Sequence, residues 1–113
     1  MVPVLELAFL NKSLRDLCES QLKAERRLGI GIAASLRARL ADLWDADTLS
    51  DIEAGPPRIL DDTPPGRVAI PLGEQTSLVF TANHVAVPRT ESGGVDWTGV
   101  TRIKIIHIGE PDG

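Results

Sequence analysis

Tyrosine is absent from this sequence, which has only two phenylalanines and two tryptophans among its 113 residues. So few aromatic rings exclude a stacking platform of the kind that binds single-stranded bases. No apolar run approaches the roughly 20 residues of a bilayer-spanning helix. The N-terminal residues lack the basic start and apolar stretch of a signal peptide. We therefore expect a cytoplasmic protein with no membrane contact.

Cysteine and positive charge are also scarce. The single cysteine, Cys18, excludes an internal disulfide. It falls on the apolar face of a predicted helix, so we expect an inert core thiol. The formal net charge of −4 argues against a protein that coats nucleic acid through its overall charge, but is compatible with a local basic patch.

Signatures of metal and cofactor chemistry are missing. His84 and His107 lie far apart, and neither has a Cys or His partner at the spacing of zinc ligands. No phosphate-binding glycine loop is present, and no serine lies on a sharp strand-to-helix turn. The sequence therefore predicts neither a metal nor a cofactor.

The composition fits one globular domain over residues 1–113, because 42% of the residues are hydrophobic and 25% are charged. Residues 4–10 predict a short strand. Asn11 or Ser13 can cap a first helix, whose apolar stripe runs from Leu14 to Leu28 and ends at Gly29. A second helix starting at Ile30 completes a hairpin. Residues 45–57 close this helical half.

The second half of the chain has strand-like patterns. We predict strands at residues 58–60, 67–72, 76–82 and 101–108, with a turn over 61–66 and a loop over 83–94. The last strand has β-branched residues on both faces, so we place it inside the sheet. These patterns predict an α+β domain, with an N-terminal strand and a helical hairpin packed on a small antiparallel sheet. We expect Trp97 to anchor the edge of its core.

Basic residues are distributed along the predicted sheet together with one histidine: Arg58, Arg67, Arg89, Arg102, Lys104 and His107. Cleavage of RNA without a metal needs a base for the 2′-hydroxyl, a donor for the leaving oxygen and cations around the phosphate. Strand alternation places Arg102 and Lys104 on one face, and His107 on the other face unless a bulge intervenes. The alternative interpretation is that these are ordinary solvated strand residues.

Three segments near the C-terminus carry a family resemblance: Val87-Pro88-Arg89, Gly93-Gly94-Val95-Asp96-Trp97, and Val100-Thr101-Arg102-Ile103-Lys104-Ile105-Ile106. They resemble the C-terminal part of HigB-like toxins of the RelE/ParE superfamily, which are often labelled plasmid-maintenance killer or killer suppression proteins. The segments around 12–19, 27–29 and 36–43 resemble the helical hairpin of the same family.

The resemblance implies a RelE-like fold, a cognate antitoxin with a helix-turn-helix domain, and contact with operator DNA only through that antitoxin. For RelE-type members it implies a metal-independent endoribonuclease that cleaves mRNA on the ribosome, an mRNA interferase. The residues that match this chemistry best are Arg67, Arg89, Arg102, Lys104 and His107. For the antitoxin contact, we expect cations from five helical arginines, unless these are simply solvated: Arg15, Arg26, Arg27, Arg37 and Arg39.

The chain also departs from the family pattern. Ser77 stands where relatives tend to carry an arginine, and the chain ends in Gly109-Glu110-Pro111-Asp112-Gly113 rather than Asp-Tyr-His. Two alternatives therefore stay open beside the mRNA interferase. One is a catalytically degenerate binding module that pairs with an antitoxin and helps to regulate the operon. The other is a ParE-like gyrase inhibitor.

Overall fold

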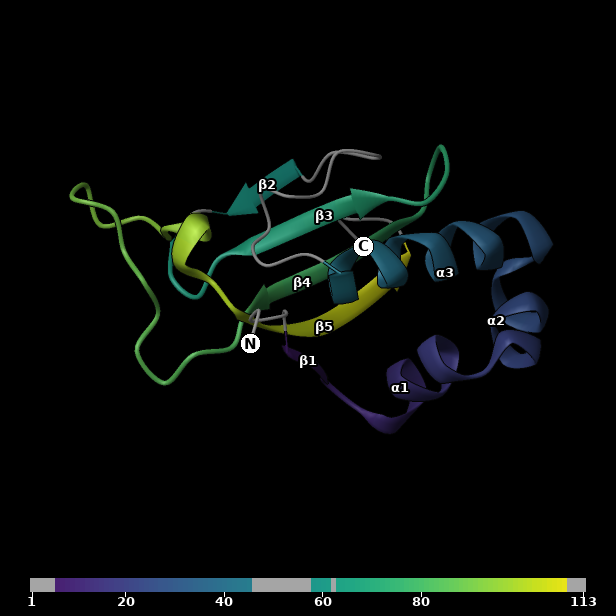
Figure 1. Cartoon of the computed structure of the whole chain (residues 1–113). Helices are drawn as coiled ribbons and strands as arrows, with labels where there is room; N and C mark the ends of the chain where they lie inside the picture. Colours follow the sequence, from purple (N-terminus) through teal and green to yellow (C-terminus); the bar gives the residue numbers. More distant parts are fainter. Residues whose placement is uncertain (1–5, 46–57, 62, 110–113) are drawn as a thin grey trace.

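The computed structural model describes residues 6–45, 58–61 and 63–109. Three helices and a five-stranded mixed sheet form an α+β arrangement (Figure 1). The elements in chain order are β1 (Glu6–Phe9), α1 (Lys12–Glu19), α2 (Gln21–Leu28), α3 (Ile30–Asp45), β2 (Arg58–Asp61), β3 (Arg67–Pro71), β4 (Ser77–Ala82), the short 3₁₀ helix η2 (Trp97–Gly99) and β5 (Arg102–Gly109). Within the described ranges, no helix is long and apolar enough to cross a bilayer.

The first predicted helix is in fact two helices, α1 and α2, which meet at Ser20. Asn11 caps α1 as predicted, because its side chain accepts a 3.0 Å hydrogen bond from the backbone N–H of Leu14. Ser20 has extended backbone angles, and its hydroxyl accepts from the N–H of Lys23 to cap α2. The apolar stripe continues through this break, so periodicity alone predicts one helix where the backbone forms two.

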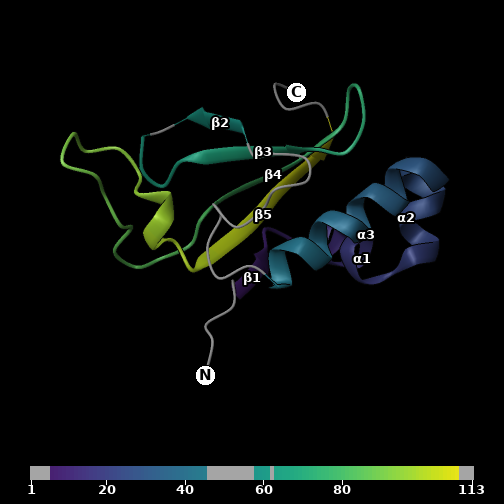
Figure 2. The same cartoon turned by 45° about the horizontal axis from the view of Figure 1, so that its top comes forward.

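Gly29 ends α2 as predicted, with a φ of +87° that favours glycine. The next helix, α3, begins at the following residue and packs against α2. Figure 2 shows α3 alongside the sheet, with α1 and α2 at the end away from the long β4–β5 loop.

The sheet has the strand order β1-β5-β4-β3-β2 and is mixed rather than antiparallel as predicted. The strands from β2 to β5 pair antiparallel with their neighbours, but β1 pairs parallel to β5, with Glu6 opposite Arg102. Nearly the whole chain separates β1 from β5, so no tight hairpin constrains them to be antiparallel. The interior position of β5, between β1 and β4, confirms the prediction for this strand.

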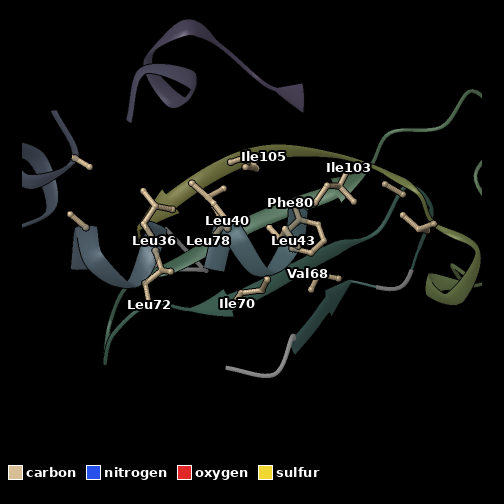
Figure 3. Packing of buried hydrophobic residues seen from close by; sticks show 14 of the residues in the cluster. Leu36, Leu40, Leu43, Val68, Ile70, Leu72, Leu78, Phe80, Ile103 and Ile105 are labelled. Carbon is tan, nitrogen blue, oxygen red and sulfur yellow. The ribbon is translucent and has the colours of Figure 1, made fainter. Parts of the chain in front are cut away.

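The core lies between α3 and one face of the sheet. Leu36, Leu40 and Leu43 recur at helical spacing on α3 and are almost fully buried. They pack onto alternate strand residues of β3, β4 and β5 (Figure 3): Val68, Ile70, Leu78, Phe80, Ile103 and Ile105. Since side chains alternate along a strand, the residues between these point to the other face of the sheet. We call this second face the open face because it lies opposite the core cluster, although its central residues Ala69, Val79 and Thr81 are buried.

Trp97 anchors the core edge, as predicted. Its ring packs against the core cluster and meets Phe80 edge to face, at a centroid distance of 6.4 Å. Gly66 lies directly beside it, because a Cβ atom at residue 66 would fall 2.7 Å from Trp97 Cζ2. The Gly93–Trp97 segment therefore packs onto the end of the sheet before β5 begins.

Several predictions concern residues outside the described part of the chain. They are the start of the first strand at residues 4 and 5, most of the closing segment at 46–57, Asp62 of the predicted turn, and the tail at 110–113.

Candidate functional site

A bulge in β5 places His107 on the open face. Along the β4–β5 ladder, Phe80 pairs with Ile105 and Val79 pairs with His107, so Ile106 is an extra residue on β5. The extra residue shifts the alternation by one position. His107 therefore shares the open face with Lys104 and Arg102. A bulge was the condition under which the sequence predicted that these three residues share a face.

Lys104 belongs to a cross-strand row on the same face. It pairs with Thr81 of β4 on one side and with Ala8 of β1 on the other. Val68 pairs with Phe80, so one step further along the β3–β4 ladder Arg67 comes beside Thr81. Arg67 and Lys104 thus flank Thr81 at a backbone separation of two strand spacings, about 10 Å. This is a span that two long basic side chains can bridge around one phosphate.

Thr81 is the polar residue at the centre of this row. It is only 7% exposed, and its Oγ1 atom has no hydrogen-bond partner within the described residues. A buried hydroxyl without a partner carries a desolvation cost of about 1–3 kcal/mol, which a ligand that hydrogen-bonds to it would remove. Sequence reasoning missed Thr81, although it is the one polar residue between the apolar positions 78–80 and 82 of the strand.

The surroundings of Thr81 decide which side chains a ligand meets. Ala69 and Val79, its neighbours on the open face, are buried, whereas Arg67 is exposed and Lys104 and His107 are half-buried. A ligand on this face therefore contacts the basic side chains first. We call Arg67, Thr81, Lys104 and His107 the basic row site.

Arg102 lies at the end of the open face and is already paired. Its Nε atom is 3.0 Å from Glu6 Oε2 of the neighbouring strand β1, and both side chains are more than half exposed. An exposed pair of this kind contributes roughly 0–1 kcal/mol, so a phosphate can compete for the guanidinium. Arg102 is thus a peripheral cation of the site.

Gly109 makes room for the His107 imidazole. A Cβ atom at residue 109 would lie 3.0 Å from His107 Nε2 and 3.3 Å from Cε1. The ring therefore lies against the backbone two residues further along β5, where any side chain would crowd it.

The remaining two basic residues of the predicted set lie elsewhere. Arg58 is on the open face but on the edge strand β2, where it pairs with Ala69, three strands away from β5. Arg89 is exposed in the long β4–β5 loop, in an isolated bridge with Val95. The structure thus brings Arg67, Lys104 and His107 together, with Arg102 nearby, and leaves Arg89 apart.

His84 has a structural role that the sequence did not suggest. Its Nε2 atom accepts hydrogen bonds from the backbone N–H groups of Thr101 at 3.0 Å and Arg102 at 3.3 Å. An imidazole that accepts through Nε2 carries its proton on Nδ1 and is neutral. His84 therefore fixes the chain at the start of β5 and is not part of the basic row site.

Cys18 packs against the core cluster from α1, as predicted. Burial, aided by the charge of Glu19, raises the pKa of its thiol from 9.0 to about 11. The thiol is therefore protonated at neutral pH and is a poor nucleophile.

The described ranges contain no group of three or more His, Cys, Asp or Glu side chains that could hold a metal ion. The chain matches no protein-family model, no curated protein and no solved structure. The functional proposal therefore depends on the geometry of the basic row site and on the sequence resemblance to HigB-like toxins.

Proposed function

We propose that this chain is the toxin of a type II toxin-antitoxin pair, with a RelE-like fold, and that it cleaves mRNA on the ribosome without a metal. The observation that carries the proposal is the bulge at Ile106, which places His107 on the same sheet face as Lys104 and Arg67. Bulges commonly re-aim a side chain next to an active site. Regular alternation would instead direct His107 toward the core.

The basic row site contains the groups that metal-free RNA cleavage requires. His107 takes the proton from a 2′-hydroxyl, whose oxygen then attacks the adjacent phosphorus. Lys104 gives a proton to the 5′-oxygen as the bond between it and phosphorus breaks. The products are a 2′,3′-cyclic phosphate and a 5′-hydroxyl end. Solvent then takes the proton from His107 and returns a proton to Lys104.

The other two members of the site bind the phosphate. The guanidinium of Arg67 pairs with two non-bridging oxygens, a geometry that its planar fork favours. The hydroxyl of Thr81, which lacks a partner within the described residues, donates a hydrogen bond to the charge that develops on the phosphate. Arg102 contacts the neighbouring phosphate once Glu6 is displaced.

The sequence resemblance supports the biological setting. The Gly93-Gly94-Val95-Asp96-Trp97 segment resembles that of HigB-like toxins, and such toxins act in the cytoplasm with a cognate antitoxin. Ser77 replaces an arginine of the family pattern, and the tail lacks the Asp-Tyr-His ending, so fewer side chains are available for catalysis. His107 and Lys104 therefore carry both proton transfers in this mechanism.

The test is induction of the isolated gene, followed by measurement of growth and transcript integrity. We expect growth arrest, cleaved mRNA and new 5′-hydroxyl ends that polynucleotide kinase can phosphorylate directly. His107→Ala should lower the cleavage rate by about 10²–10⁴-fold, the usual effect of removing a general base. Lys104→Ala should also relieve the arrest.

Arg37→Ala is the matched control, because Arg37 is an exposed arginine on α3, which covers the other face of the sheet. This variant should remain as toxic as the unmodified protein. Normal growth with intact transcripts would overturn the proposal. If the chain then still formed a stable complex with the product of a neighbouring helix-turn-helix gene, the non-catalytic antitoxin-binding alternative would replace it. Inhibition of DNA supercoiling with intact mRNA would favour the gyrase alternative.

A further inference from the structure

A hollow of about 350 Å³ lies where α1 and α2 pack together. Figures 1 and 2 show these helices beyond the end of the sheet, on the side away from the β4–β5 loop. The hollow is therefore separate from the basic row site. Its lining combines one apolar residue with a hydroxyl and four charged groups: Ser13, Asp16, Leu17, Lys23, Arg26 and Arg27.

The charges in this lining do not balance. The Nζ atom of Lys23 is 3.3 Å from Asp16 Oδ2, so the lysine and the single carboxylate neutralise each other. Arg26 and Arg27 are both exposed and form no ion pair with any described residue. The hollow thus presents two uncompensated guanidinium groups.

Two other arginines of the helices form ion pairs. Arg15 pairs with Glu19 at 3.9 Å, and Arg39 pairs with Asp42 at 3.2 Å. Asp16 and Glu19 of α1 and Asp42 of α3 are thus each paired with another cation. Arg37 on α3 is also exposed and has no ion pair with a described residue, but it does not line the hollow, whereas Arg26 and Arg27 lie side by side in its lining.

Exposed aliphatic side chains border the same surface. Leu22, one turn before Arg26 on α2, is 56% exposed, and Ile30, at the start of α3, is 76% exposed. Single exposed aliphatic residues are common. Here Leu22 shares a side of α2 with Arg26 through its i,i+4 spacing, and Ile30 follows the end of α2 by two residues. A ligand that matches this surface needs both carboxylates and apolar side chains.

We propose that this hollow, together with Leu22 and Ile30, is a docking site for an acidic amphipathic segment of a protein partner. Carboxylates of the segment pair with Arg26 and Arg27, where bidentate contacts are possible, and its apolar face covers the two aliphatic side chains. The inference rests on the proposed pairing with an antitoxin and names the surface that the antitoxin contacts. A nucleic acid fits less well, because the surface has exposed aliphatic side chains and no aromatic ring in its lining.

The experiment measures binding of a labelled synthetic helix, made of Glu and Leu with Leu at helical spacing, by fluorescence anisotropy. The protein is the full chain with His107→Ala, so that toxicity does not prevent its preparation. We expect saturable binding that weakens about tenfold or more in the double variant R26Q/R27Q, because the charge-assisted hydrogen bonds of both guanidinium groups are lost. The variants L22A and I30A should each weaken binding several-fold.

Two controls define the specificity. Arg58→Gln removes an exposed arginine on the edge strand β2, outside the hollow, and should leave the binding unchanged. A peptide in which Gln replaces every Glu should bind at least tenfold more weakly. Equal loss of binding in R58Q and R26Q/R27Q, or equal binding of the Gln peptide, would overturn the proposal.

A labelled RNA oligonucleotide tests whether this surface binds nucleic acid instead of a protein segment. If it binds more tightly than the peptide, and loses that binding in R26Q/R27Q, the site is a nucleic-acid site and the proposal is wrong. The result of the peptide-binding experiment is independent of the result of the toxicity experiment. Loss of toxicity in His107→Ala reports on RNA cleavage, whereas peptide binding is measured in a protein that already carries that change.

Discussion

The Nε2 atom of His84 lies 3.0 Å from the backbone nitrogen of Thr101, and the N–H of Arg102 donates to the same atom. One imidazole therefore holds the first two amides at the start of β5. The carbonyl of Thr101 in turn accepts a 2.8 Å hydrogen bond from the N–H of Glu6. The interaction thus connects the loop that follows β4 to the place where β1 and β5 join.

Replacing His84 by Ala should lower the free energy of unfolding by about 1–3 kcal/mol, because the Thr101 N–H is partly buried and would lose its acceptor. Urea denaturation followed by circular dichroism measures this change. Val85→Ala is the matched control, since the adjacent Val85 side chain is fully exposed. An equal effect of both changes would contradict the role given to His84.

Thr81→Val should separate stability from activity. Valine has nearly the same shape as threonine but lacks the buried hydroxyl that has no partner within the described residues. The variant should be as stable as the unmodified protein or more stable by up to about 1–2 kcal/mol. If the hydroxyl binds the phosphate, cleavage of mRNA should fall about tenfold, the effect of losing one hydrogen bond.

Thr81→Ser retains the hydroxyl and serves as the control for this prediction. It should keep most of the cleavage activity while losing some stability through the missing methyl group. Full activity in Thr81→Val would remove Thr81 from the basic row site. The two readouts are a thermal melt and a transcript-cleavage assay.

Local signals in the sequence predicted most of the secondary structure. The side chain of Asn11, the freedom of Gly29 to adopt a positive φ, and the β-branched run in β5 each act within a few residues, so their effects can be derived from sequence alone. The break at Ser20 was missed because the serine lies within a continuous apolar stripe. Its choice between helix interior and cap depends on tertiary packing.

The site was less predictable, because it depends on long-range register. Alternation placed Lys104 correctly, but the side of the sheet on which His107 lies depends on how Ile106 fits against β4. The position of Thr81 beside Arg67 requires the pairing of β3 with β4. The parallel pairing of β1 with β5 likewise joins residues nearly a hundred positions apart, and no local pattern encodes it.

Alkylation of Cys18 should be slow in the folded protein. Its pKa of about 11, against an ordinary value of 9.0, reduces the thiolate population at neutral pH by about 100-fold, and the thiolate is the reactive form. Iodoacetamide labelling followed by mass spectrometry should therefore be about 100-fold faster in urea-unfolded than in native protein. Glu19→Gln removes the smaller cause of the shift and should speed native labelling. Equal rates in the native and unfolded states would contradict the pKa shift.

The same shift predicts how alkali affects stability. The fold favours the neutral thiol, so this contribution is fully present below pH 9 and declines as the pH rises from 9 toward 11. Cys18→Ala should therefore lose less stability than the unmodified protein between these pH values. Urea midpoints measured at pH 8 and pH 10.5 for both proteins provide the comparison. Parallel declines in the two proteins would assign the alkaline effect to other groups.

Gly66→Ala should be among the most destabilising single changes in the sheet half of the chain. The φ of Gly66 is +76°, where a Cβ atom costs roughly 1–2 kcal/mol. That atom would also lie 2.7 Å from Trp97 Cζ2 and 2.9 Å from Val95 Cγ2, and overpacking of a core edge costs a further 1–3 kcal/mol or so. We expect a total loss of about 2–5 kcal/mol in the free energy of unfolding, and a shifted tryptophan emission as Trp97 moves.

Gly31→Ala, in contrast to Gly66→Ala, should not destabilise the protein. Gly31 lies in the first turn of α3, its φ is negative, and a Cβ atom there would meet nothing within 4 Å. Alanine should therefore leave the stability unchanged or raise it by up to about 1 kcal/mol, because it reduces the freedom of the unfolded chain. Urea denaturation measures both variants. A similar loss of unfolding free energy in Gly31→Ala and Gly66→Ala would contradict the explanation that residue 66 must be glycine because it lies so close to Trp97.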